Sequence, residues 1–251
     1  MAASSATSTA VYVYGVVRAD ELPAVAAEGV ADAPVELLEH DGLAALVSKL
    51  PGRDFRVKRR DLQRHLQVLE DAFGEATIVP CPFGTVVVSE DAVRGMLLTE
   101  RREELLAALA RLEGKVQLNV KAVYDEEELL RELLRLHPEL ARLQASTKRL
   151  GDAGYYEQIR LGELIAAALS ERRELDSQRL LRHLDERSED TVIEPAADYV
   201  ALKASFLVSR KQLRKFDDAL ERAAEAEQPA LRIEVIGPLP PTAFAAAAAG
   251  G

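Results

Sequence analysis

Strand-like and helix-like patterns follow one another in the second half of the chain in an order that few folds accommodate. Residues 115–124 (KVQLNVKAVY) alternate apolar and polar side chains, which is typical of a strand with one buried face. Helical patterns then run to about residue 184, with a break at Pro138 and a glycine-bounded loop at 151–154. Strands at 190–195 and 199–209, a helix from about 213 and a strand from 231 follow. This is the ferredoxin-like order, with extra helices in its first crossover.

The first half of the chain predicts a smaller α/β unit. Residues 11–17 are rich in β-branched and aromatic side chains, and residues 34–48 form two short strands that turn at Asp41 and Gly42, a hairpin signal. The other elements we expect are a helix through Leu62, Leu66, Leu69 and Phe73, an interrupted strand at 77–88, and a helix from its N-cap Ser89 to about Leu112. Gly114 ends this last helix, so that two mixed units meet near it.

These patterns place the chain in the mixed α/β (α+β) class with two domains. We expect a small N-terminal α/β domain over residues 11–112 and a modified ferredoxin-like domain with a helical insertion over residues 113–244. Residues 1–10 and 245–251 are mostly small and of low complexity, which predicts disordered tails.

The composition limits the possible partners and compartments. The chain has 32 Lys and Arg against 42 Asp and Glu, a formal net charge of −10, which argues against a general nucleic-acid binder. No run of about eighteen apolar residues predicts a membrane span, and the first residues lack the basic and apolar regions of a secretion signal. Cys81 is the single cysteine, so that no intramolecular disulfide forms. We therefore expect a soluble cytoplasmic protein.

Cys81 is the first residue to consider for catalysis, because it lies between Pro80 and Pro82 directly ahead of a Phe-Gly-Thr turn. A catalytic cysteine needs a nearby base or a helix N-terminus to lower its pKa, and no sequence rule brings His65 to it. We therefore interpret Cys81 as a structural residue in a tight bend. Gly84 is expected to take a backbone conformation that other residues disfavour.

Metal and cofactor patterns are absent from the sequence. Its four histidines form no H-x-x-x-H or H-E-x-x-H pair, and C-x-x-C, G-x-S-x-G, Walker and G-x-G-x-x-G motifs are missing. Asp61 and His65, four residues apart on one helix, are expected to form a surface ion pair. The sequence therefore predicts neither a metal nor a cofactor.

One stretch of the chain, residues 53–64 (RDFRVKRRDLQR), is strongly basic. Its cations Arg59, Arg60 and Arg64 are candidate contacts for an acidic partner or an anion. The alternative interpretation is a solvated helix start. Basic residues at a helix N-terminus interact unfavourably with the helix dipole. This mild energetic cost favours a functional role for them.

Seven stretches of the chain carry a resemblance to a known family. They are YVYGVV, the residues from His65 to Glu70, VPCPFGTVV, GKVQLNVKAVY, GYYEQIRLGELIAAAL, ASFLVSR and RIEVIGPLPPTAF. In this order and spacing they resemble the gas vesicle GvpF/GvpL family over nearly the whole chain. The motif residues that the resemblance singles out are His65, Pro80, Phe83, Gly84, Thr85, Gly237 and Pro238. The sequence departs from the family pattern at Pro82, where a basic residue is usual, and at Leu239 and Thr242.

The resemblance implies a non-enzymatic accessory protein of gas vesicle assembly, located at the gas vesicle and working without a cofactor. Its implied partners are the small hydrophobic wall protein and other accessory proteins, during nucleation or wall growth. Free wall subunits would aggregate through their apolar face unless another protein held them.

Two other classes stay open from the residues alone. One is a ferredoxin-like regulatory module that binds a small molecule, and the other is an enzyme that uses Cys81 or His65. If the wall protein is the partner, we expect it to bind residues 113–244, because their strands are the more amphipathic and a sheet edge accepts a further strand.

Overall fold

The computed structural model describes residues 10–24, 28–51, 58–150, 154–196, 199–227 and 231–245, and the remainder of both expected tails lies outside these residues. By its internal contacts the chain divides into two compact units. The first comprises Met1–Gln117 with Pro238–Gly251, and the second comprises Leu118–Gly237.

This division differs from the expected domain limits at the C-terminal end. The segment after Gly237 groups with the first unit, where the backbone N–H of Ala243 donates to the side-chain oxygen of Gln117 at 2.8 Å. Ala10 and Ala245, which we expected within disordered tails, are both described and buried. Ala10 is held because its carbonyl accepts the N–H of Leu50 at 2.8 Å.

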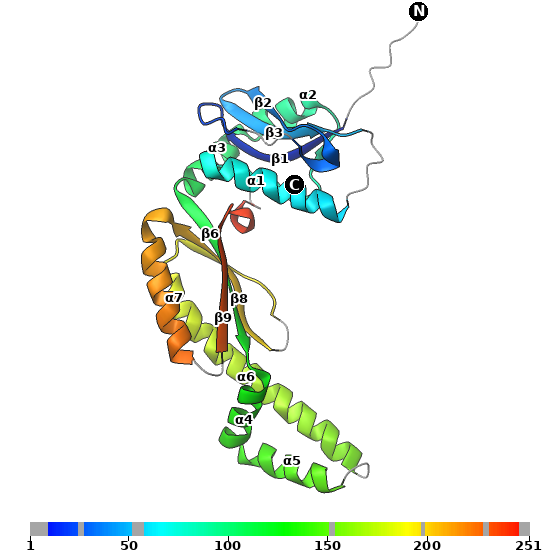
Figure 1. The fold of residues 1–251 in the computed structure, drawn as a ribbon, viewed down its shortest axis with the longest axis vertical. Helices are drawn as coiled ribbons and strands as arrows, with labels where there is room; N and C mark the ends of the chain where they lie inside the picture. The colour runs from blue at the N-terminus through cyan, green and yellow to red at the C-terminus, as the bar shows by residue number, and fades with distance from the viewer. Residues whose placement is uncertain are drawn as a thin grey trace, which may run out of the picture. The chain divides into compact units, whose positions relative to one another are not determined.

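The first unit is built on a five-stranded antiparallel sheet in the order β2-β3-β1-β4, with β5 also paired to β1 (Figure 1). The strands are β1 (Val11–Arg18), β2 (Glu36–His40), β3 (Leu43–Lys49), β4 (Val79–Pro80) and β5 (Val86–Val87). The predicted hairpin at Asp41 and Gly42 is confirmed, since both residues have positive φ (53° and 82°), as a two-residue hairpin turn requires.

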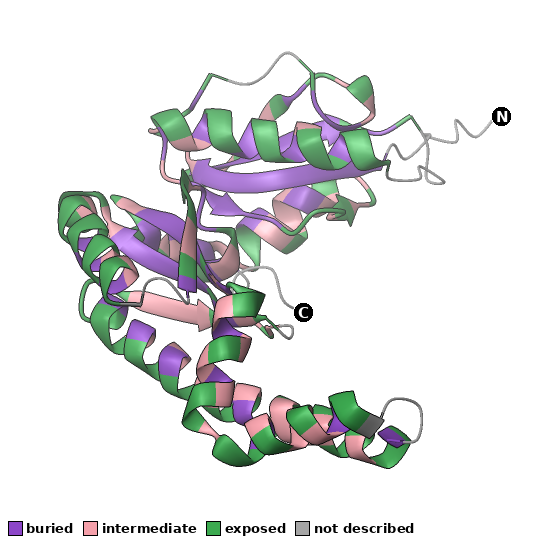
Figure 2. Cartoon of the chain, turned by 60° about the horizontal axis from the view of Figure 1, so that its bottom comes forward, coloured by how far each residue is buried: buried purple, intermediate pink, exposed green. Residues whose placement is uncertain are grey.

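Helices cover both faces of this sheet. They are α1 (Arg59–Glu75), α2 (Glu90–Ala92) and α3 (Arg102–Leu112), with shorter turns η1 (Val30–Asp32) and η2 (Val93–Thr99). On one face, Val68, Leu69 and Ala72 of α1 join a buried cluster with strand residues. On the other, η2 and α3 contact β1 and β3, and the strands between the helices are largely buried (Figure 2).

The helix expected over 89–112 is interrupted. Ser89 does cap its start, since its Oγ accepts the N–H of Ala92 at 3.2 Å. Residues 93–99 then form a π-helical turn, in which the N–H of Glu100 donates to the carbonyl of Gly95 at 3.0 Å. The flexible backbone of Gly95 and the Thr99 hydroxyl, which donates to the Arg94 carbonyl at 2.8 Å, account for the widened turn.

The second unit has the predicted ferredoxin-like order. Its strands are β6 (Lys115–Tyr124), β7 (Asp190–Ile193), β8 (Val200–Ser209) and β9 (Leu231–Leu239), which lie in the order β7-β8-β6-β9. The two strands that come first and third along the chain therefore form the centre of the sheet, as in that fold. Its helices are α4 (Glu126–Leu136), α5 (Pro138–Leu150), α6 (Tyr155–Asp185) and α7 (Leu213–Glu227).

The helical insertion begins as the sequence predicts. Asp125 caps α4, with its carboxylate accepting the N–H of Glu128 at 2.9 Å, and Pro138 is the first residue of α5. Figure 1 shows α4 and α5 beside the outer part of α6. None of the helices in the described part of the chain is long and apolar enough to cross a membrane.

Candidate functional site

The Pro-rich segment between β4 and β5 forms a tight turn at the edge of the first unit's sheet. The N–H of Cys81 donates to the carbonyl of Tyr14 at 2.8 Å, which keeps the segment on β1 up to that point. The chain then reverses over 82–85, where the N–H and hydroxyl of Thr85 both donate to the carbonyl of Pro82, at 3.1 and 2.7 Å. Gly84 has a φ of 92°, as a type II turn requires and as its neighbours predicted.

A buried tyrosine and a buried histidine stabilise this turn through hydrogen bonds on its inner side. The N–H of Gly84 donates to the Tyr12 hydroxyl at 3.0 Å, and that hydroxyl lies 3.0 Å from Nδ1 of His65 on α1. The hydroxyl oxygen accepts from Gly84, and which partner donates in its bond to Nδ1 depends on the imidazole tautomer. Three distant segments, β1, α1 and the turn, are thus joined at one hydroxyl.

Burial fixes the protonation of this pair. His65 is 3% exposed, and burial lowers its pKa to about 4, so that the imidazole is neutral near pH 7. Burial likewise raises the pKa of Tyr12, which keeps its hydroxyl proton. The rings of His65 and Phe83 meet edge-on at 5.5 Å, and the ring of Tyr14 stacks on His65 at 5.7 Å. The turn is therefore held by both hydrogen bonds and ring packing.

A second set of buried bonds holds the N-terminal end of α1. The Tyr14 hydroxyl accepts the N–H of Val30 at 2.7 Å and donates to Ser48, whose own proton goes to the Pro34 carbonyl. Asp61 accepts the backbone N–H groups of Ala31 and Lys58, at 3.2 and 2.7 Å. Tyr14 and Asp61 thus bind the 30–34 segment to the sheet and to the helix.

The prediction of a surface ion pair between Asp61 and His65 is therefore wrong. Both side chains are buried, at 1% and 3% exposure. The Asp61 carboxylate caps the start of its own helix, where backbone donors satisfy it, while His65 faces Tyr12. Helical spacing alone does not reveal that both residues lie on the inner side of α1.

Cys81 lacks the surroundings of a reactive thiol. It is 8% exposed, and burial raises its pKa to about 12, so that the thiol stays protonated at neutral pH. Within the described residues, no group of three or more His, Cys, Asp or Glu is arranged to hold a metal ion. The geometry around the turn is that of a structural site.

The basic residues of α1 lie on its outer side. Arg60 pairs with Asp32 at 2.9 Å and Arg64 with Glu28 at 2.8 Å, so that both cations are engaged within the first unit. Arg59 is exposed. The start of the basic stretch, at 53–57, lies outside the described residues.

Four apolar side chains stand exposed beside the turn, and we call them the apolar face. They are Leu62 (39% exposed), Leu66 (43%), Phe83 (38%) and Val86 (47%).

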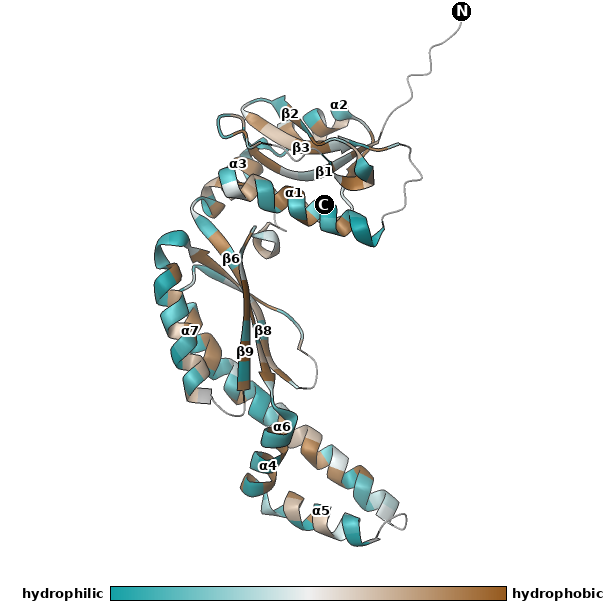
Figure 3. Ribbon diagram, in the orientation of Figure 1, coloured by the Kyte–Doolittle hydropathy of each residue, from teal (hydrophilic) through white to brown (hydrophobic). Residues whose placement is uncertain are grey.

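Three observations place these side chains together. Arg60 and Arg64 hold one flank of α1 toward the 28–32 segment, which leaves Leu62 and Leu66 on the opposite flank. On the turn, the ring of Phe83 contacts His65. Val86 is paired with Tyr12 across the sheet, so that both side chains point to the side of α1. Figure 3 shows apolar positions among the hydrophilic ones along α1.

Sequence reasoning found some of these residues and missed others. It singled out His65, Phe83, Gly84 and Thr85, which the structure brings together at the turn. Pro80, also singled out, is buried in β4 opposite Gly15 of β1. The remaining two motif residues, Gly237 and Pro238, lie near the exposed end of β9, where Gly237 has a φ of 153°. Tyr12 and Tyr14 were missed, although their alternation in VYVY puts both on one face of a strand, where buried hydroxyls need partners.

Comparison with known proteins finds similar sequences and similar folds. The family model described as gas vesicle synthesis protein GvpL/GvpF matches residues 10–246. Gas vesicle protein F of Streptomyces sp. (strain CB03234) is 36% identical over 237 residues, which cover 93% of this chain and 98% of that protein. The crystal structure of GvpF from Anabaena sp. PCC7120 has a TM-score of 0.79 at 26% identity, covering 95% of this chain and 98% of that one. The GvpF structure from Microcystis aeruginosa has a TM-score of 0.72 at 26% identity, with 94% and 99% covered.

Proposed function

Because this chain belongs to the GvpL/GvpF family of gas vesicle synthesis proteins, we propose that it is a non-enzymatic accessory protein that binds the small hydrophobic wall protein during gas vesicle assembly. Other accessory proteins are its further partners. A non-catalytic role fits the buried, protonated Cys81 thiol and a neutral His65 that is engaged with Tyr12.

The apolar face is the observation that carries this proposal. A wall subunit that has not yet entered the wall needs its apolar surface covered, and Leu62, Leu66, Phe83 and Val86 offer an apolar surface of their own. The buried bonds from Tyr12 to Gly84 and His65 hold the turn in one conformation. A surface held in this way loses little conformational entropy when a partner binds.

This assignment moves the proposed contact from the second unit, which the sequence favoured, to the first. The amphipathic strands that suggested residues 113–244 are used for the internal packing of β6 and β8, whose apolar residues are buried. The basic residues of α1 contribute in a different way. Arg60 and Arg64 are already paired, and exposed Arg59 lies at the rim, where a charge affects mainly the association rate.

The test compares two double variants by co-purification with co-expressed wall protein. Leu62→Gln with Leu66→Gln removes two members of the apolar face, and Ile159→Gln with Leu175→Gln makes the same change on exposed positions of α6 (44% and 53%). We expect the first variant to retain about a tenth or less of the wall protein, because buried apolar area supplies the affinity. The α6 variant should retain nearly all of it.

The reverse pattern, with loss only in the α6 variant, would contradict the proposal and return the contact to the second unit. Both variants change exposed side chains on helices to a good helix former, so that their melting temperatures should stay near that of the unchanged protein.

A further inference from the structure

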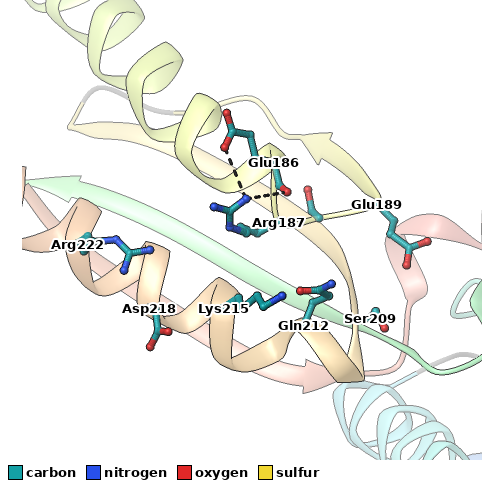
Figure 4. Close-up of a pocket in the computed structure, with 9 residues that line it drawn as sticks. Glu186, Arg187, Glu189, Ser209, Gln212, Lys215, Asp218 and Arg222 are labelled. Atoms are coloured by element: carbon teal, nitrogen blue, oxygen red, sulfur yellow. Dashed lines mark hydrogen bonds and ion pairs between the residues drawn. The ribbon is translucent and has the colours of Figure 1, made fainter.

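Strand β9 forms one edge of the second unit's sheet. In the strand order β7-β8-β6-β9 it pairs with β6, and its other side has no partner strand among the described residues. Helices α6 and α7 contact each other and β8, so that they lie together on one face of this sheet (Figure 4). The backbone N–H and C=O groups along the outer side of β9 are therefore available to a further strand.

The residues of β9 do not protect this edge over most of its length. Proteins usually protect an exposed edge with lysine, proline, a bulge or a very short strand, and the opposite edge strand, β7, has only four residues. Between Leu231 and Ile236, in contrast, β9 has no lysine, proline or glycine. Val235 and Ile236 are 40% and 64% exposed. Gly237 and Pro238 follow, and because proline has no N–H to donate, they limit any further pairing to the residues before them.

The side chains of β9 form two rows, because successive residues of a strand point to opposite faces. Leu231, Ile233 and Val235 share the face on which Leu231 is buried. Arg232 and Glu234 share the other face, where their exposed side chains form an ion pair at 2.8 Å. An exposed pair of this kind contributes little within one chain, so that both charges remain available to a charge on another strand.

Both rows are complementary to themselves when a second copy of β9 runs antiparallel beside the first. With Ile233 opposite Ile233 of the copy, Arg232 of each chain faces Glu234 of the other, and Leu231 of each faces Val235 of the other. Each exposed valine is then covered by a leucine, and each charge meets its opposite. A two-fold interface requires a surface of this self-complementary kind.

The neighbouring registers of such a pair are less favourable. A two-fold axis places one residue opposite its own copy, because directly opposed residues point to the same face of a sheet. A pair centred on Arg232 or on Glu234 opposes like charges, which is destabilising. A pair centred on Val235 places Pro238 opposite Arg232 and leaves both charges without an opposite. The sequence of β9 therefore favours Ile233 as the centre.

We propose that this protein forms a two-fold dimer in which β9 pairs with β9 of a second copy, so that two four-stranded sheets become one continuous sheet. A contact limited to residues 231–235 of each chain is smaller than a standard protein interface. The dimer should therefore be weak, with a dissociation constant in the micromolar range or above. These residues belong to the second unit alone, and the proposal does not rest on the apolar face.

Sedimentation velocity of the full chain, at a series of concentrations up to about 100 μM, measures the dimer directly. Arg232→Glu places a glutamate opposite Glu234 of the other copy, and the two-fold symmetry makes this change act twice. We expect the dissociation constant to rise by about tenfold or more. Arg214→Glu makes the same change on an exposed residue of α7 and should raise it by less than about threefold.

The double variant Arg232→Glu with Glu234→Arg exchanges the two charges and thereby tests the register. In a pair centred on Ile233 the exchanged charges again face their opposites. The dissociation constant should therefore return to within about threefold of that of the unchanged protein. Because both side chains are exposed, the melting temperatures of these variants should stay near that of the unchanged protein.

A protein that stays monomeric at every concentration would overturn the proposal. A dimer that Arg232→Glu does not weaken would also overturn it, because that dimer would use another surface. The same holds for a loss that the charge exchange fails to restore, because the two strands would then not meet at Ile233.

Discussion

At the scale of single residues, the Tyr12 hydroxyl of β1 bonds both the turn and helix α1. It accepts the N–H of Gly84 and shares a hydrogen bond with His65, and its ring lies 6.4 Å from that of Phe83. A buried hydroxyl with both functions satisfied stabilises the fold, whereas the loss of one partner leaves a buried polar group unpaired. Phe83 is thereby held at the surface by atoms that are themselves buried.

His65 gives the stability of the protein a defined dependence on pH. Its pKa is lowered from its usual 6.5 to about 4 in the folded protein, so that between these values the unfolded chain binds the extra proton. The contribution of neutral His65 to the free energy of unfolding is therefore fully present above about pH 6.5, and it is lost as the pH falls toward 4. The loss should reach about 2–3 kcal/mol.

Urea denaturation of the protein and of His65→Gln, at several pH values from 4 to 7, measures this contribution. The difference between the two unfolding free energies cancels the other titrating groups and should shrink steadily as the pH falls. A difference that stays constant over this range would show that His65 is not buried in its neutral form.

The backbone conformations of some residues were predictable from their immediate neighbours in the sequence. Asp41, Gly42 and Gly84 follow from turn rules that involve only their neighbours. The contact between Tyr12 and His65 could not be predicted, because 53 positions separate them and no periodicity connects a strand to a helix that far along the chain. The sequence did not predict the exposure of Leu62 either, for a related reason. The helical repeat shows which residues share a side of a helix but not which side is covered.

At the scale of elements, a buried ionic network ties the helical insertion to the ferredoxin-like sheet. Asp176 of α6 accepts from the Tyr124 hydroxyl of β6 at 2.9 Å and from Arg172 at 2.7 Å, and Arg172 also pairs with Glu132 of α4 at 2.9 Å. Asp176 is fully buried. The network therefore fixes where α4 and α6 leave the sheet.

Asp176→Ala should destabilise the second unit by about 3–5 kcal/mol. The reason is that the Arg172 guanidinium and the Tyr124 hydroxyl each lose the carboxylate to which they donate. Urea denaturation followed by circular dichroism measures the change. Arg131→Ala is the control on α4, since it removes only exposed pairs with Glu127 and Glu128 and should leave the unfolding free energy nearly unchanged. Equal effects of the two substitutions would contradict a buried anchor.

The order of elements was more predictable than their continuity. The strand at 115–124, the Asp125 cap and the later strands predicted the ferredoxin-like order, because each element carries its own periodicity and end signals. The break between η2 and α3 was not predicted. The apolar residues on both sides of it keep helical spacing, and neither Gly95 nor Thr99 by itself predicts a π-helical turn at 93–99.

At the scale of the whole molecule, the GvpL/GvpF family match spans residues 10–246 and therefore includes residues of both units. The wall-protein contact that we propose uses the apolar face of the first unit alone. Exposed apolar positions of the second unit therefore serve as its controls.

Site-specific photo-crosslinking tests the wall-protein contact most directly. Phe83→p-benzoylphenylalanine places the crosslinker on the apolar face, and Tyr156→p-benzoylphenylalanine places it on α6 at a more exposed position (81% against 38%). In cells that assemble vesicles, we predict a crosslink from position 83 to the wall protein and none from position 156. A wall-protein crosslink from position 156 without one from position 83 would contradict the account.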